Sequence, residues 1–336
     1  MFLFKRFSTH CTLALFCFGL LATSESFAQQ KPYDSIVVFG GSLSDSGNAF
    51  VVLSDPSSFG FDDTCGPLTP MNVPPYNMLD DLYVPDGTYA IGGHHVSNGA
   101  TWIEQLARNN ALAGFTRPAL RNDGQQARNY AVGGARANDY ECRFNLSNQL
   151  GAFFNSSVGL TSDSLVVFEM GGNDLRDVLA GADPTSTIGG ALNNIFNAIV
   201  ALYNQGARQF LLMNVPDIGK TPAVQILDIY YPGLAALATN LTVSFNGELS
   251  GMQWYFNTYF PDMDVRIFDA YTLLDSIITS PDDYGIEVTD VPCVTPNVAP
   301  YKCTNPDAYL FWDGIHPTKA VHKIMAEAAA EVLSTP

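Results

Sequence analysis

A serine, an aspartate and a histidine occur in two short motifs near opposite ends of the chain. Ser42 lies in the glycine-rich segment Phe39–Asp45 (Phe-Gly-Gly-Ser-Leu-Ser-Asp), which begins at the end of the apolar run Ile36–Phe39. Asp313 and His316 stand three residues apart in the segment Asp-Gly-Ile-His-Pro. A serine hydroxyl becomes a nucleophile when a histidine accepts its proton and a carboxylate fixes the tautomer of that histidine. The two motifs together therefore supply the parts of an acyl-transfer triad.

The spacing of Asp313 and His316 fits a tight turn that also contains Gly314 and Pro317. In such a turn the carboxylate reaches the nearer ring nitrogen, while the other ring nitrogen faces outward. The same pattern also fits an aspartate that caps the helix expected from Lys319 onward, because aspartate is a common N-cap residue. By itself this motif leaves both interpretations open.

Three features offer hydrogen-bond donors of the kind that a tetrahedral oxyanion requires. The first is the backbone N–H of Ser42, at a turn that follows a predicted strand. The glycine pair 133–134 follows the apolar run Asn129–Val132, where bare backbone can approach a substrate. Asn173, in a Gly-Gly-Asn-Asp segment after the run Leu165–Glu169, offers its side-chain amide. The two later clusters also fit a simple turn or a helix cap.

The rest of the chain alternates short apolar runs with longer segments of helical spacing. The apolar runs predict strands at Ile36–Phe39, Asn129–Val132, Leu165–Glu169, Phe210–Asn214 and Val265–Phe268. The helical spacing predicts helices at Ala100–Ala107, Ile188–Tyr203, Leu234–Tyr255 and Lys319–Leu333. This alternation indicates the α/β class, with a mostly parallel central sheet covered on both faces. Active sites in such sheets form at the carboxyl ends of the strands.

The chain shows no repeat and no linker, so we expect a single domain at residues 29–336. Two segments near 54–95 and 280–309 are predicted to be insertions, and loops of this length are usually lids or binding loops. Their aromatic side chains either line an acyl groove or pack within the loops: Phe59, Phe61, Tyr76, Tyr83, Tyr89 and Tyr284.

Residues 1–28 have the features of a secretory signal peptide. Lys5 and Arg6 form a basic start, and the apolar run Cys11–Ala22 is too short to span a bilayer. The segment Ser26–Ala28 matches the small-x-small cleavage pattern. The sequence therefore predicts export to the periplasm or out of the cell, without choosing between them.

The exported chain is strongly acidic. Lys5, Arg6 and Glu25 would leave with the signal peptide, which reduces the 16 basic and 33 acidic residues to 14 and 32, a net charge of −18. Such a surface argues against nucleic-acid binding, which depends on cationic side chains, and against electrostatic docking on anionic lipid. We expect a monomer with no nucleic-acid partner and at most transient contact with a membrane surface.

Four cysteines remain after cleavage, and an even number in an exported chain predicts two disulfides. Cys293 and Cys303 bracket a proline-rich stretch, so we pair them, which leaves Cys65 with Cys142 by elimination. A zinc site is the alternative, but the chain has no CxxC pair. The histidines that lack ligand spacing with the cysteines are His94, His95 and His322.

Taken in order, the motifs resemble those of the GDSL esterase/lipase family, also called SGNH hydrolases. The matching blocks are Phe39–Asn48, Asn129–Ala135, Gly171–Asp174 and Asp313–Thr318, with a further likeness at Asn214–Pro222. The resemblance covers residues 33–333. It implies a three-layer α/β/α fold of the flavodoxin-like SGNH type and a serine esterase or lipase that needs no metal or organic cofactor.

The resemblance also assigns roles to individual residues. Ser42 matches the nucleophile, and Asp313 and His316 complete the triad. The oxyanion hole would be formed by the backbone N–H groups of Ser42 and Gly134 and by the side-chain amide of Asn173.

Gly41 departs from the family pattern, which has aspartate at this position. The residue is not a triad member, so the chemistry is expected to survive. The hydrogen bonding that steadies the nucleophile turn is nevertheless in doubt, with reduced activity or altered stability as the expected consequences.

The form Ser-Leu-Ser-Asp-x-Gly-Asn in an exported chain resembles that of bacterial phospholipases A, lysophospholipases and glycerophospholipid:cholesterol acyltransferases. Those relatives also tend to carry a disulfide loop shortly before the catalytic aspartate, which Cys293–Cys303 would match. The expected function is therefore hydrolysis of lipid acyl esters, with cholesterol or another alcohol as a further acceptor. Two alternatives stay open: a carbohydrate or short-chain esterase on the same fold, and a non-catalytic lipid- or glycan-binding protein.

Overall fold

The computed structural model describes residues 33–61, 95–121, 126–294 and 303–335. Residues Pro32–Pro336 form one compact unit. The predicted signal peptide, Cys65 and most of the predicted insertion at 54–95 lie outside the described residues.

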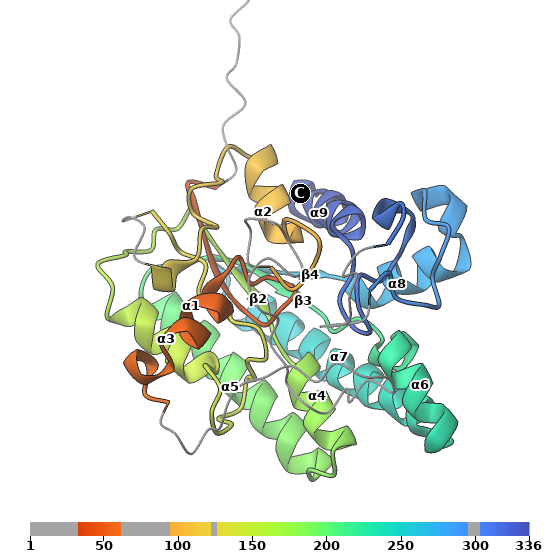
Figure 1. Cartoon of the computed structure of the whole chain (residues 1–336). Coiled ribbons are helices and arrows are strands. Elements are labelled where there is room, and N and C mark those ends of the chain that lie inside the picture. The colour runs from red at the N-terminus through yellow and green to blue at the C-terminus, as the bar shows by residue number, and fades with distance from the viewer. Residues whose placement is uncertain (1–32, 62–94, 122–125, 295–302, 336) are drawn as a thin grey trace, which may run out of the picture. The chain divides into compact units, whose positions relative to one another are not determined.

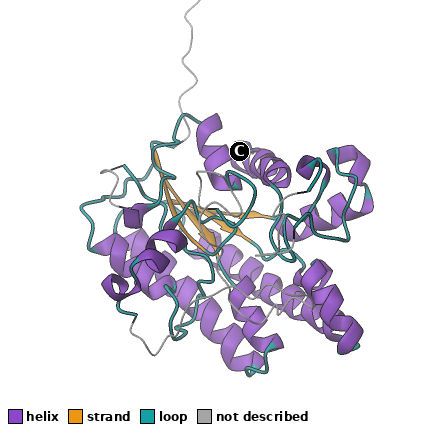
Figure 2. Cartoon of the chain, in the orientation of Figure 1, coloured by secondary structure: helices purple, strands orange, loops and turns teal. Residues whose placement is uncertain are grey.

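A sheet of four parallel strands forms the centre of this unit (Figure 2). The strands lie in the order β1 (Ser35–Gly40), β2 (Ser164–Glu169), β3 (Gln209–Met213) and β4 (Asp264–Phe268). Because neighbouring strands are parallel and helices cover both faces, β1, β2 and β3 are nearly continuous apolar runs, whereas the edge strand β4 carries Arg266 between Val265 and Ile267. The structure therefore confirms four of the five predicted strands.

The fifth predicted strand, Asn129–Val132, does not form a regular strand. The segment nevertheless lies beside the sheet. It lies along the free edge of β1, joined by one isolated bridge between Val38 and Asn129. The backbone N–H of Tyr130 donates to the Val38 carbonyl at 2.8 Å. The side chain of Asn48 donates to two backbone carbonyls of this segment, each at 2.8 Å. The Asn129 carbonyl also accepts the backbone N–H of Ala119 at 2.8 Å, and the segment forms isolated bridges to Val38 and Pro118 rather than a regular strand.

Helices cover the two faces of the sheet with two separate apolar clusters. Val37 and Phe39 face α3 (Leu146–Phe154), α4 (Gly172–Leu179), α5 (Pro184–Asn204) and α7 (Leu234–Tyr259). Ile36 and Val38 face α2 (Trp102–Asn109), α8 (Ala270–Thr279) and α9 (Lys319–Ser334). In Figure 1, α2 and α9 lie on one side of the strands, with α4, α5 and α7 on the other. This is the predicted three-layer α/β/α arrangement.

The four predicted helices are present as α2, α5, α7 and α9. The described residues contain further helices that the spacing did not reveal: α1 (Asn48–Ser54), α3, α4, α6 (Pro222–Tyr230) and α8. All of them have ten residues or fewer, and α1 and α4 begin within motifs that were interpreted as turns. None of the helices in the described ranges is both long enough and apolar enough to cross a membrane.

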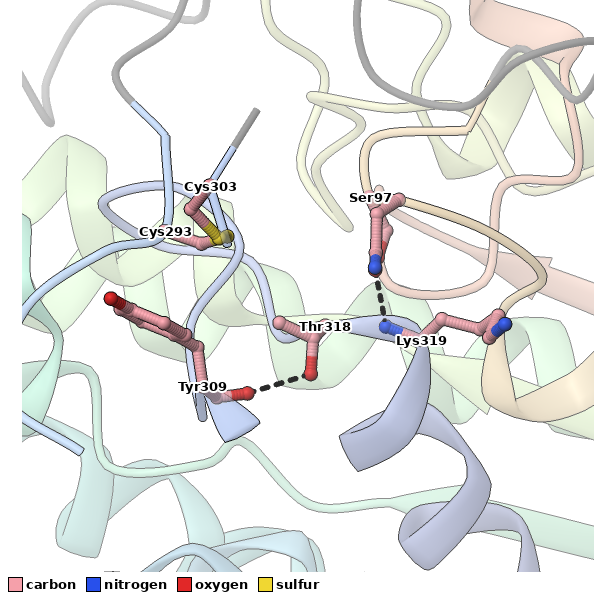
Figure 3. Close-up of a disulfide and its surroundings, with 7 residues drawn as sticks. Ser97, Cys293, Cys303, Tyr309, Thr318 and Lys319 are labelled. Carbon is pink, nitrogen blue, oxygen red and sulfur yellow. Dashed lines mark hydrogen bonds between the residues drawn. A yellow bond between two sulfur atoms is a disulfide. The ribbon is translucent and has the colours of Figure 1, made fainter. Parts of the chain in front are cut away.

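A disulfide joins Cys293 and Cys303, whose Cα atoms are 5.4 Å apart (Figure 3). The backbone N–H of Cys293 donates to the Phe311 carbonyl at 3.0 Å, so this segment lies against the chain that leads to Asp313. Nearby, the hydroxyl of Thr318 donates to the Tyr309 carbonyl at 2.7 Å. Cys142 is also disulfide-bonded, whereas its predicted partner Cys65 lies outside the described residues.

Replacing both Cys293 and Cys303 by serine should lower the free energy of unfolding by about 3 kcal/mol, because the ten-residue loop is then unconstrained in the unfolded chain. Urea unfolding followed by circular dichroism measures this difference. The exposed neighbour Thr304 provides a control, since Thr304→Ala should leave the midpoint unchanged. An unchanged midpoint in the double serine variant would contradict the stabilising role of the disulfide.

Candidate active site

The Ser42 turn is held on both sides where β1 ends. Gln149 binds the Gly40 backbone twice, accepting from its N–H at 3.0 Å and donating to its carbonyl at 2.9 Å. The N–H of Gly41 donates to the Glu169 carbonyl at 3.1 Å, and that of Ser44 to the Gly41 carbonyl at 3.3 Å. The backbone before Ser42 is therefore fixed to β2 and α3, and the bond from Ser44 to Gly41 closes the turn around Ser42.

Asp45 joins the Ser42 turn to the segment that contains the glycine pair. Its buried carboxylate accepts the backbone N–H groups of Gly47, Asn48 and Ala49 at 2.6–2.9 Å. It also accepts the N–H of Gly133 at 2.8 Å. Burial raises the pKa of Asp45, and these four donors oppose that shift by stabilising the ionised form.

Asp313 organises its own turn. Its Oδ1 accepts the backbone N–H groups of Ile315 at 2.8 Å and His316 at 2.7 Å. The turn is fixed from outside as well, because the Ala223 N–H donates to the Gly314 carbonyl at 2.9 Å. The helix-cap alternative does not hold, since Thr318 is the residue that caps α9.

The structure brings Ser42, His316 and Asp313 together in a single relay. The Ser42 Oγ lies 2.8 Å from the His316 Nε2. The other ring nitrogen of His316, Nδ1, lies 2.8 Å from the Asp313 Oδ2. With Nδ1 protonated and bonded to the carboxylate, Nε2 is left as an acceptor for the serine proton.

The predicted oxyanion donors lie around the same turn. The amide nitrogen of Asn173 donates to the Ala135 carbonyl at 2.9 Å, and its oxygen accepts from the Arg176 Nη1 at 2.7 Å. Asn173 and Ala135 both line the cavity that contains Ser42. Gly134 itself is outside that lining, next to Ala135, with a φ of 77° that favours glycine.

The family model of GDSL-like lipases/acylhydrolases matches residues 36–329. The chain belongs to this family. It is 22% identical to the thermolabile hemolysin of Vibrio parahaemolyticus, with 92% of this chain and 66% of that protein aligned. It is 29% identical to GDSL esterase/lipase At2g04570 of Arabidopsis thaliana, over 49% of this chain and 52% of that protein. The chain thus spans between about half and two thirds of the length of these two relatives.

A solved structure of a lipolytic protein of the G-D-S-L family from Veillonella parvula aligns with 90% of this chain and 99% of its own, at 14% identity and a TM-score of 0.40.

An ion pair and a buried carboxyl group hold the Gly134 segment of this GDSL protein against α4. Arg136 binds Asp177 through Nε at 2.9 Å and Nη2 at 2.6 Å, and its Nη1 donates to the Gly134 carbonyl at 2.7 Å. Asp174 accepts the backbone N–H groups of Ala137 at 2.9 Å and the next residue at 3.0 Å. Burial raises the pKa of Asp174 to about 6. Sequence reasoning identified neither contact, because both depend on pairs about 40 residues apart.

The cavity around Ser42 has a volume of about 630 Å³, including space open to solvent, and contains two ionisable side chains that the motifs did not predict, Glu169 and Arg176. Burial raises the pKa of Glu169 to about 8. A signal for Glu169 was available: a carboxylate ends the otherwise apolar strand β2, directly before the Gly-Gly-Asn-Asp motif. In the described ranges, no group of three or more His, Cys, Asp or Glu side chains could hold a metal ion.

A second cavity of about 470 Å³ adjoins the first and is lined mainly by apolar side chains. The two cavities share Leu43, Pro216, Thr221 and Ile315. The other residues that line the second cavity come mostly from α8, α9 and the strand-like segment before Asp313: Ala270, Leu273, Leu274, Ile277, Leu310, Phe311, Pro317, Val321 and Met325.

For the aromatic loop residues that the structure describes, the packing alternative holds. Phe59 packs against Phe144 at a ring distance of 5.7 Å, and Phe61 joins the same cluster. Tyr284 packs against the apolar cluster of α8 and α9. None of these three rings lines either cavity around Ser42. The other candidates lie outside the described residues: Tyr76, Tyr83 and Tyr89.

Arg136→Met should lower the free energy of unfolding by about 3–5 kcal/mol, because it leaves the Asp177 carboxylate without its buried partner. Arg136→Met combined with Asp177→Leu should lose less than the single variant, since no charge is then left behind. Urea unfolding of both variants checks this order. A double variant less stable than Arg136→Met would show that the pair itself, rather than the stranded charge, carries the energy.

Proposed function

We propose that this GDSL protein is a serine-dependent acyl-ester hydrolase. The observation that carries the proposal is the relay in which the Ser42 Oγ lies 2.8 Å from the His316 Nε2, with Asp313 bonded to the opposite ring nitrogen. This arrangement activates a serine hydroxyl and serves no packing role on the surface of a cavity.

In the first step His316 accepts the proton of Ser42 while the Ser42 Oγ attacks the ester carbonyl carbon. The carbonyl oxygen becomes an oxyanion, which the N–H groups of Ser42 and Gly134 and the Asn173 amide are proposed to stabilise. Asp313 keeps His316 in the required tautomer and stabilises the imidazolium. His316 then donates its proton to the leaving alkoxide, and the acyl group stays on Ser42.

In the second step an acceptor molecule attacks the acyl-serine. His316 removes its proton and later returns a proton to Ser42, which restores the free enzyme. Water as acceptor gives hydrolysis, whereas cholesterol or another alcohol would give acyl transfer. His316 can deprotonate either acceptor, so the outcome depends on which molecule enters the cavity.

Ser42→Ala and His316→Ala should each lower kcat by about 10⁴-fold or more, because either change removes one half of the proton transfer. Hydrolysis of a p-nitrophenyl ester measures the loss, and circular dichroism checks that the fold is intact. Ser162→Ala, at an exposed serine on the loop before β2, is the matched control and should retain full activity. Retention of activity by Ser42→Ala would contradict the mechanism.

We infer that the substrates are lipids, with phospholipase A or lysophospholipase activity as the most specific form. The apolar cavity begins at Leu43 and Ile315, the neighbours of the two reacting residues, is partly open to solvent, and its apolar lining suits an aliphatic acyl chain. Arg176 places a positive charge in the Ser42 cavity, which suits a phosphate-bearing leaving group. One relative is named a hemolysin and another an esterase/lipase, which also supports lipid esters.

Export through the predicted signal peptide completes this proposal. The disulfide between Cys293 and Cys303 supports it, because disulfides persist in oxidising compartments.

Leu274→Trp should fill the apolar cavity and shorten the acyl chain that the enzyme prefers. Each buried methylene contributes about 0.8 kcal/mol, which corresponds to about fourfold in kcat/KM. The variant should therefore lose activity on a palmitoyl ester while keeping it on an acetyl ester. Leu237→Trp, at an exposed position of α7, is the control and should leave the chain-length profile unchanged.

An equal loss on both esters would contradict the assignment of this cavity to the acyl chain. A lipid panel with mass-spectrometric product detection then tests the head group and the acceptor, with cholesterol included. Activity on acetylated sugars but not on lysophosphatidylcholine would favour the carbohydrate-esterase alternative.

A further inference from the structure

The family name spells Gly-Asp-Ser-Leu, whereas this chain has Gly40-Gly41-Ser42-Leu43. The structure shows what borders the space that a side chain at position 41 would enter. A Cβ atom at Gly41 would lie 3.6 Å and 3.7 Å from the two carboxyl oxygens of Glu169. The same point lies 3.4 Å from the Asn173 amide nitrogen. The space beside Gly41 is therefore bordered by a carboxyl group from β2.

From this position, the Glu169 carboxyl group forms hydrogen bonds with the turn that contains Ser42. Its Oε2 accepts the backbone N–H of Gly41 at 3.0 Å. The backbone N–H and the hydroxyl of Ser44 lie close enough to the same carboxyl group to lower its pKa, and the Gly41 N–H is shared with the Glu169 backbone carbonyl. Gly40 also needs to be small, since a Cβ there would stand 3.1 Å from the Glu169 Oε2. The carboxyl group thus holds the residues on both sides of Ser42 and closes one wall of its cavity.

We propose that Glu169 is a positioning residue that supplies, from the end of β2, the carboxyl group that is absent from position 41. This inference rests on the proposed function. Its action is indirect: Glu169 fixes the backbone of Gly41 and Ser44, and the backbone in turn fixes the Ser42 hydroxyl and N–H.

Gly41 and Glu169 depend on each other, because each residue limits what the other position can hold. An aspartate at position 41 would extend its carboxyl group beyond a Cβ that already lies within 3.7 Å of both Glu169 oxygens. Two carboxyl groups in one poorly solvated space cannot both ionise without a large cost. Gly41 and Glu169 are therefore compatible, whereas the carboxyl group of an aspartate at position 41 would compete with that of Glu169 for the same space, and a smaller residue at position 169 would relieve this competition.

The protonation state of Glu169 follows from its surroundings. Withdrawal from bulk water is the main cause that raises its pKa to about 8, the charge of Asp45 adds to that rise, and hydrogen bonds from Gly41 and Ser44 oppose it. The other charged or titratable groups that line the same cavity are Arg176 and His316. At neutral pH the carboxyl group is uncharged, so it does not oppose an oxyanion that forms beside Asn173. Above the pKa its negative charge destabilises that oxyanion, and turnover falls.

The test compares ester hydrolysis by the full exported chain and by variants at positions 169 and 41. Glu169→Ala should lower kcat by about 10- to 100-fold with little change in KM, because a misplaced nucleophile affects the transition state more than binding. Glu169→Gln keeps an acceptor for the Gly41 N–H and should retain most of the activity at pH 7. The decline in kcat/KM above about pH 8 should be present in the wild type and absent from Glu169→Gln.

A double-mutant cycle tests the reciprocity. Gly41→Asp alone should lose activity, and Gly41→Asn separates the effect of charge from that of bulk because it adds a similar side chain without the charge. Gly41→Asp combined with Glu169→Ala should recover at least about tenfold over Gly41→Asp, because only one carboxyl group then occupies the space. Thermal melts accompany each variant, and if Glu169→Ala fails to fold, the pH profile of Glu169→Gln carries the test.

Full activity of Glu169→Ala, an alkaline decline that persists in Glu169→Gln, or losses that simply add in the double variant would each overturn the proposal. These results differ from a failure of the proposed function, in which the wild type itself would show no ester hydrolysis dependent on Ser42.

Discussion

Ser42 and His316 are 274 positions apart in the sequence, and the proposed chemistry depends on holding their Oγ and Nε2 atoms 2.8 Å from each other. Two supports meet at this contact. On one side, a strand buried on both faces ends in a turn that Gln149 fixes. On the other side, the Asp313 carboxylate accepts the backbone N–H groups of Ile315 and His316, which fixes the turn that carries the imidazole. The two supports are independent of each other, so a displacement of either turn would separate the reacting atoms.

Buried carboxylates connect the motifs that surround this contact. Asp45 ties the Ser42 turn to Gly133, and Asp174 ties α4 to the segment after Gly134. Glu169 sits between them, beside the glycine that replaces an aspartate. Each of these carboxyl groups accepts hydrogen bonds from backbone N–H groups. Some of the acidic residues of the chain thus lie inside the site, where their carboxyl groups fix loops instead of solvating a surface.

The sequence predicts those features of the molecule that short local patterns determine. Apolar runs revealed β1 to β4 because strands buried on both faces are continuous in sequence. The residues of the relay could be named because each motif is short and contiguous. The clamp of Arg136 on Asp177 could not be predicted, since nothing in either segment indicates its partner. The segment 129–132 is hydrogen-bonded to β1, but it also bonds to the Asn48 side chain and the Ala119 backbone and forms isolated bridges rather than a regular strand. Glu169 was counted as the last residue of a strand, and only its distance from Gly41 shows its second role.

Labelling with a fluorophosphonate probe, followed by peptide mapping, tests the central claim most directly, because it reports an activated serine without requiring knowledge of the substrate. The account predicts a single adduct, on the peptide that contains Ser42, and loss of that adduct in His316→Ala. Absence of an adduct on Ser42 in the folded wild-type chain, or labelling that is unchanged in His316→Ala, would contradict it.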